Sequence, residues 1–221
     1  MRKDLLVNGE IYHVFNRSIA DFVIFNNEKE FERIAELMKY YQVENDIKFS
    51  AFLELRNVQN EGFNNTFDII SKDKDKLVQI IAYCIMPTHI HFILKQMSEN
   101  GISDYMRKVL DSYTRYFNTC HKRKGPLWEG KFKNVLIISD DQLLHLTRYI
   151  HLNPVTAFLI EKPDNWVWSS YTEYLWEGKR ASSLCHFDDI LEIKPSFYRK
   201  FVIDRVSYQR ELGKIKKLIM D

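Results

Sequence analysis

The pattern of apolar and polar positions is clearest at residues 80–94, where two short apolar runs flank Pro87-Thr88. Both runs are rich in isoleucine and aromatic residues, which is typical of two β-strands joined by a tight turn. Because side chains alternate between the two faces of a strand, His89 and His91 point the same way and Ile90 points to the other side. The pattern therefore predicts a hairpin that carries two imidazoles on one face.

Strand-like alternation also covers residues 10–17, where Ile11, His13 and Phe15 share one face. The apolar residues of 48–56 and 127–138 predict two further strands. Between them, the polar stretch 57–76 is expected to be a long loop or an inserted hairpin.

Helical spacing of apolar residues predicts helices over 27–43 and 101–121. A third helix should begin at Ser139, which can cap it, with Gln142 at the capping-box position. This helix is expected to finish near Asn153, because Pro154 disfavours helical geometry at the residue before it. A basic amphipathic helix is predicted at about 196–219.

Together these elements predict an α+β fold, a ferredoxin-like βαββαβ sandwich with an appended helix that carries Tyr149. The expected organisation is one domain over residues 1–176, with an insertion at about 57–76. Residues 177–221 are expected to form a basic, helical C-terminal extension.

The chemistry of the appended helix depends on its period. Tyr149 and Asn153 lie four residues apart and share a helix face, and His145 lies on that face one turn earlier. If this face covers His89 and His91, two imidazoles and an amide oxygen could hold a divalent cation with open positions for phosphate oxygens. A tyrosine beside such a site could attack a phosphodiester as a covalent nucleophile. The alternatives are packed, hydrogen-bonded histidines and a buried core tyrosine.

The motifs of the chain resemble those of one family. His89-Ile90-His91 after Met86-Pro87 resembles the HUH signature, and Arg148 to Val155 resembles the tyrosine-helix motif of the REP-associated tyrosine transposases. Three further stretches match in the family's order, at residues 12–17, 128–133 and 168–171. The resemblance covers residues 8–176, although Thr88 stands where relatives often have asparagine.

The resemblance implies a single-tyrosine transposase-like endonuclease that cleaves and rejoins single-stranded DNA near imperfect hairpins. It implies Mg²⁺ or Mn²⁺ as the cofactor and a 5′-phosphotyrosine intermediate. Carried over to this chain, Tyr149 is the nucleophile, and the metal ligands are His89, His91 and Asn153. His145 and His151 are the candidates for a proton relay or a further ligand.

Charge is distributed unevenly, although the net charge of the 221 residues is only +2. Residues 101–135 carry a net charge of +5 and residues 196–221 a net charge of +4, and in the first of these segments the cations interleave with aromatic residues. This combination suits single-stranded nucleic acid, through phosphate contacts and base stacking. The expected DNA-binding residues are Arg17, Lys122, Arg123, Lys124, Trp128, Lys131 and Lys133, and the alternative is a basic surface loop with Trp128 in the core.

The remaining sequence features exclude several classes. Three cysteines without a CxxC motif favour a reducing cytoplasm and no zinc site, and no apolar run is long enough to span a membrane. The expected partner is single-stranded or hairpin DNA, with a homodimer as one expected assembly. Two alternatives are a non-cleaving regulator that binds hairpin DNA or RNA, and a relaxase or replication initiator. The order of the motifs disfavours the relaxase or initiator, because the tyrosine follows the histidines along the chain.

Overall fold

An antiparallel β-sheet of four strands forms the centre of the computed structural model, which describes residues 5–178 and 183–220. The order across the sheet is β2-β3-β1-β4, which places the histidine strand inside the sheet. The strands are β1 (Ile11–Arg17), β2 (Val78–Met86), β3 (His89–Gln96) and β4 (Lys133–Leu136). The predicted α+β class and the predicted hairpin at Pro87-Thr88 are confirmed.

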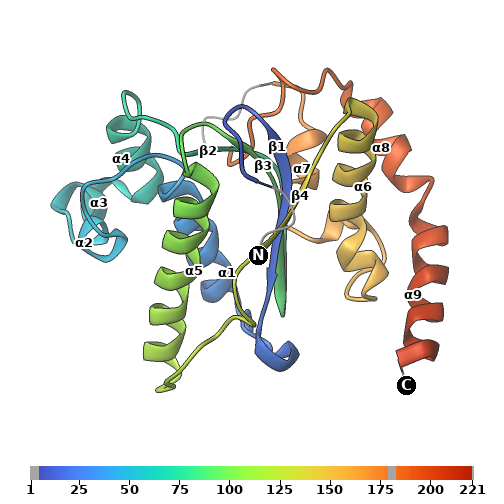
Figure 1. Cartoon of the computed structure of the whole chain (residues 1–221), viewed down its shortest axis with the longest axis horizontal. Coiled ribbons are helices and arrows are strands. Elements are labelled where there is room, and N and C mark those ends of the chain that lie inside the picture. The colour runs from blue at the N-terminus through green and yellow to red at the C-terminus, as the bar shows by residue number, and fades with distance from the viewer. Residues whose placement is uncertain (1–4, 179–182, 221) are drawn as a thin grey trace.

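Helices cover both faces of this sheet (Figure 1). On one face lie α1 (Glu28–Tyr40) and α5 (Gly101–Cys120), which follow β1 and β3 along the chain and complete the βαββαβ order. They bury the side chains of Tyr12, Val14 and Phe92. Asn27 caps α1 by accepting a hydrogen bond from the Glu30 amide.

Residues 48–76 differ from the prediction of a strand followed by a loop or hairpin. They form three short helices, α2 (Phe49–Leu53), α3 (Arg56–Glu61) and α4 (Phe63–Ile70). The aromatic residues of α2 and α4 are spaced three or four apart and pack around the ring of Tyr40, with centroid distances of 4.9 Å to Phe52 and 5.7 Å to Phe67. This helical spacing favours burial against α1 over strand pairing, so the strand prediction for 48–56 was wrong.

The opposite face of the sheet is covered by α6 (Asp140–Thr156) (Figure 1). The helices that come after it along the chain are α7 (Tyr171–Tyr174), α8 (Pro195–Ile203) and α9 (Val206–Met220), and α9 packs on the side of α6 away from the sheet. Ser139 caps α6 by accepting a hydrogen bond from the Gln142 amide. The helix does not end near Asn153 as predicted, because Pro154 lies in its last turn, where the missing amide removes a single helical hydrogen bond.

Two other boundaries also differ. The strand predicted over 127–138 is limited to β4, because residues 127–132 form a loop beside the end of β1. The single helix predicted at 196–219 is divided into α8 and α9 by a turn at Asp204-Arg205. Two short 3₁₀ helices complete the described elements, at Ile19–Asp21 and Pro163–Asn165.

None of the helices in the described part of the chain is long and apolar enough to cross a lipid bilayer. This agrees with the reading of the sequence.

Candidate active site

The register of the two central strands gathers five side chains on the sheet face beneath α6. In the antiparallel pair, Arg17 lies opposite His89, Phe15 opposite His91 and His13 opposite Ile93. Residues that face each other across such a pair project to the same side of the sheet. The five side chains are those of His13, Phe15, Arg17, His89 and His91.

His91 is held by its neighbours on β1. Its Nδ1 atom lies 2.9 Å from Nε2 of His13, and the two rings are stacked with centroids 5.2 Å apart and planes 15° from parallel. The ring of Phe15 packs beside both imidazoles. If His91 donates through Nδ1–H, its Nε2 remains available as an electron-pair donor.

His89 is oriented from within the hairpin. Its Nδ1 atom lies 3.0 Å from the hydroxyl oxygen of Thr88, so its Nε2 atom is also available. The rings of His89 and His91 lie edge to face, with centroids 5.1 Å apart. Two imidazoles in this arrangement can bind one cation between them.

Burial keeps these imidazoles uncharged at neutral pH. It lowers the pKa of His13 and of His89 to about 4, with a further contribution from the charge of Arg17 at His89. It also places the pKa of His91 well below its usual value, an effect that the neighbouring histidines reinforce. A neutral imidazole is the form that binds a metal ion.

Tyr149 approaches this face from α6. Its ring lies edge to face with that of His91, with centroids 6.1 Å apart, and 39% of the residue is exposed. Burial of the remainder raises the pKa of the Tyr149 hydroxyl, which therefore retains its proton at neutral pH. A partly exposed phenol beside two neutral imidazoles is accessible to an extended substrate.

Asn153 lies one turn beyond Tyr149 on the same helix face. Within the described residues, its buried Nδ2 atom has no hydrogen-bond partner. The oxygen and nitrogen of a side-chain amide are told apart only by their hydrogen-bond partners. The unpaired position of Asn153 is therefore also consistent with the amide oxygen standing there. Two imidazole nitrogens and an amide oxygen fit a divalent cation, although the described residues include no group of three or more His, Cys, Asp or Glu arranged for one.

The other two histidines of α6 lie elsewhere. His145 is near the surface, with Nδ1 2.7 Å from an Arg148 nitrogen and its ring against Phe201 of α8. His151 is fully buried, with Nδ1 2.6 Å from the Tyr198 hydroxyl and Nε2 2.7 Å from the Ser170 hydroxyl. Both ring nitrogens of His151 are thus engaged, which contradicts a role as metal ligand.

The His151 contacts fix the position of α6 over the sheet. Ser170 accepts a hydrogen bond from the amide of Tyr83 on β2, at 2.9 Å. Tyr198 belongs to α8. His151 therefore links the tyrosine helix to both a sheet strand and a C-terminal helix.

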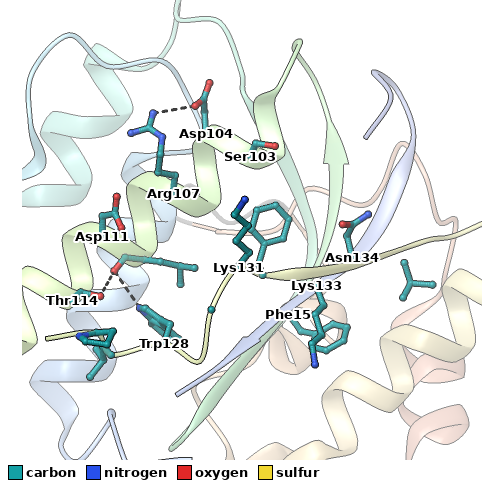
Figure 2. A pocket seen from close by; sticks show the side chains of 16 residues that line it. Phe15, Ser103, Asp104, Arg107, Asp111, Thr114, Trp128, Lys131, Lys133 and Asn134 are labelled. Atoms are coloured by element: carbon teal, nitrogen blue, oxygen red, sulfur yellow. Dashed lines mark hydrogen bonds and ion pairs between the residues drawn. The ribbon is translucent and has the colours of Figure 1, made fainter. Parts of the chain in front are cut away.

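The expected DNA-binding residues separate into two groups. Arg17 and Lys133 are exposed, and both project from the sheet on the side of the histidines, since Lys133 lies opposite Phe15. Lys131 instead extends towards α5, while Lys133 extends the other way beside Phe15 (Figure 2). The structure thus brings Arg17 and Lys133, but not Lys131, to the face that carries Tyr149.

Lys122, Arg123 and Lys124 lie in the loop after α5. Arg123 donates hydrogen bonds to the carbonyls of Gly125 and Pro126, which shape this loop. Trp128 is only 8% exposed, and its Nε1–H donates to the Leu110 carbonyl. Its ring packs in the core with Phe25 and Tyr113, which favours the alternative that Trp128 is a core residue over the prediction that it stacks on DNA bases.

A cavity beside this site reaches two residues of the site's sheet face, Phe15 and Lys133. It has a volume of about 980 Å³ and lies between α5 and the segment 126–135 (Figure 2). Its lining includes Lys131 and Trp128 but neither the two histidines of β3 nor Tyr149.

His13 is the site residue that sequence reasoning missed. It was placed on a strand face with Phe15, but no signal indicated that this face would adjoin the histidine strand. That contact depends on which strands pair and in which register, and these are properties of the fold rather than of the local sequence.

Comparison with known proteins shows what the segment that carries this site is similar to. Residues 53–153 match the family model described as IS200-like transposase. The matched segment contains both histidines of β3, Tyr149 and Asn153. Over these residues, a little under half of the chain, the protein is similar to the IS200-like transposases.

Two proteins that are similar to this chain are named as REP-associated tyrosine transposases. A Haemophilus influenzae protein named as a REP-associated tyrosine transposase is 31% identical over 104 residues, which are 42% of this chain and 58% of that protein. A solved REP-associated tyrosine transposase bound to a REP hairpin is similar in structure, with a TM-score of 0.53 and 13% identity over 81% of this chain and 92% of that one. The chain spans little more than half of the first relative, and the second likeness shows the mixed α+β fold.

The buried position of His151 predicts a pH dependence of stability. Burial lowers its pKa to about 3, whereas the unfolded chain binds the proton near pH 6.5. Between these pH values the unfolded state binds more protons than the folded state. The contribution of His151 to the free energy of unfolding is therefore complete above pH 6.5 and is lost as the pH falls towards 3. From pH 7 to pH 4, the wild type should lose about 2–3 kcal/mol more unfolding free energy than His151→Gln. Urea titrations at several pH values would measure this, and parallel curves would contradict it.

Proposed function

We propose that this protein is a metal-dependent tyrosine transposase that nicks and rejoins single-stranded DNA near hairpins. The observation that carries the proposal is the position of Tyr149, whose ring lies edge to face with His91. The hairpin-bound relative and the family match support DNA with a hairpin as the substrate.

Each residue of the site has a defined task in this reaction. The Tyr149 oxygen attacks the phosphorus of a phosphodiester and loses its proton, while the bond from phosphorus to the 3′-oxygen breaks and that oxygen gains a proton. The products are a 5′-phosphotyrosine link and a free 3′-hydroxyl. Because a phenoxide leaves more readily than an alkoxide, a 3′-hydroxyl can later attack the link and release Tyr149.

A divalent cation, Mg²⁺ or Mn²⁺, would supply charge stabilisation at the phosphate when it is bound. His89, His91 and Asn153 would hold it, with Thr88 and His13 fixing the imidazole tautomers. Arg17 and Lys133 would bind the phosphates on either side of the cleaved bond.

The function is tested by covalent capture. Full-length protein would be incubated with labelled single-stranded hairpin DNA and Mn²⁺ and run on a denaturing gel. The wild type should give a protein-linked band that Tyr149→Phe lacks. Tyr208→Phe removes an exposed tyrosine of α9 and should keep the band. Hairpin binding without a covalent band, across metals and substrates, would indicate a non-cleaving regulator.

His13 should act as a positioning residue for His91. His13→Phe keeps a ring but removes the acceptor, and it should raise the Mn²⁺ concentration for half-maximal cleavage about 10–100-fold. His13→Gln retains an acceptor and should recover much of this loss. Thermal unfolding of both variants would control for stability, and an unchanged Mn²⁺ requirement in His13→Phe would contradict the role.

A further inference from the structure

An exposed apolar cluster lies on the loop that follows β1. Ile19, Phe22 and Val23 are 38%, 47% and 43% exposed, although they are large apolar side chains within five residues of each other. Single exposed apolar residues are ordinary, but a contiguous group on one loop is typical of a surface that binds something.

The loop is held rigidly in this conformation. The carbonyl of Pro87 accepts hydrogen bonds from the amides of Ile24 and Phe25, and the Ser18 amide donates to the carbonyl of Thr88. Ala20 and Asp21 both have left-handed backbone conformations, with φ of 50° and 51°. Such conformations are costly for residues other than glycine and persist where the surrounding structure enforces them.

The loop is positioned at the edge of the candidate site. Thr88, which bonds to Ser18, also contacts the ring of His89. Arg17 lies just before the loop and faces His89, and its ion pairs with Asp21 and Glu129 are long and exposed, at 3.8 and 3.7 Å. Ion pairs of this kind contribute little, so Arg17 can exchange them for a phosphate.

Phe22 lies beside a second cation, Arg123. The Arg123 guanidinium is 5.7 Å from the centre of the Phe22 ring, and the rings of Phe22 and Phe117 are perpendicular, with centroids 6.0 Å apart. Lys122 is exposed beside Arg123. An exposed aromatic ring beside cations is the combination that binds single-stranded nucleic acid, because a base can stack on the ring while the cations contact phosphates.

We infer that Phe22 is a stacking platform for an unpaired base of the DNA strand that enters the site past Arg17. This inference rests on the proposed function and names the part of the chain that binds the single-stranded segment. Phe22 takes the role that the sequence assigned to Trp128, whose ring is buried. The Arg123 guanidinium beside the ring, with the exposed Lys122 next to it in the chain, favours a polyanion over a second copy of the chain.

The test measures binding separately from cleavage, in full-length protein that carries Tyr149→Phe. The probe is a fluorescent DNA hairpin with a single-stranded tail, followed by anisotropy. Phe22→Ala should weaken binding about 10-fold, because loss of one base stack has an effect of that order. Phe22→Trp should retain the affinity, and Phe197→Ala, which removes a phenylalanine of α8 that is 57% exposed, should leave it unchanged.

A second arm identifies the occupant. In the protein that keeps Phe22, replacing the tail bases with abasic sites should weaken binding by the same factor as Phe22→Ala does. In the Phe22→Ala protein, the abasic tail should cause no further loss of affinity. The salt dependence of binding should be equal for the two proteins, because Phe22 carries no charge.

Three outcomes would overturn the inference while leaving the proposed chemistry intact. The first is equal DNA affinity with and without Phe22→Ala. The second is that the losses of affinity from Phe22→Ala and from the abasic tail add up. The third is that Phe22→Ala weakens binding equally for a hairpin without a tail. Dimerisation that Phe22→Ala abolishes, with unchanged DNA affinity, would overturn it in favour of a second copy. A missing covalent band in the cleavage assay would count against the proposed function alone.

Discussion

The pairing register of β1 against β3 is the constraint on which the candidate site depends. It places Arg17 beside His89 and Phe15 beside His91, and it brings His13 within hydrogen-bond distance of His91. Because side chains alternate along a strand, a slip of one residue in this pairing would move the polar side chains of one strand into the apolar core on the other face of the sheet. That core accepts Tyr12, Val14 and Phe92, so apolar burial on one face enforces the arrangement of polar groups on the other.

The second requirement is the placement of α6. In the proposed reaction, Tyr149 attacks a substrate held at His89 and His91, which requires its helix to stay in a fixed position over the sheet. His151 provides this connection, through Ser170 to the backbone of β2 and through Tyr198 to α8. The C-terminal helices thus help to hold the tyrosine helix in place, and Thr156 extends this packing to Gln209 of α9.

Much of this arrangement could be predicted from local patterns. The alternation around His89 and His91, the helical period of α5 and the cap at Ser139 are signals that depend on neighbouring residues alone. The helices of residues 48–76 were missed because aromatic residues at short spacing suit either a strand or a helix, and packing against Tyr40 decides between them. His13, the burial of Trp128 and the engagement of both nitrogens of His151 depend on contacts between distant segments. A single sequence carries no local signal for these.

The most direct test of the central claim is to locate the covalent DNA link within the protein. The wild-type protein would be reacted with hairpin DNA and Mn²⁺, trimmed with nuclease and digested after Arg148 and Glu161, which isolates residues 149–161 with Tyr149 as their single tyrosine. The account predicts that mass spectrometry finds a nucleotide on this peptide, and that His89→Ala lacks it. A nucleotide attached to any other tyrosine, or an equal yield from His89→Ala, would contradict the site described above.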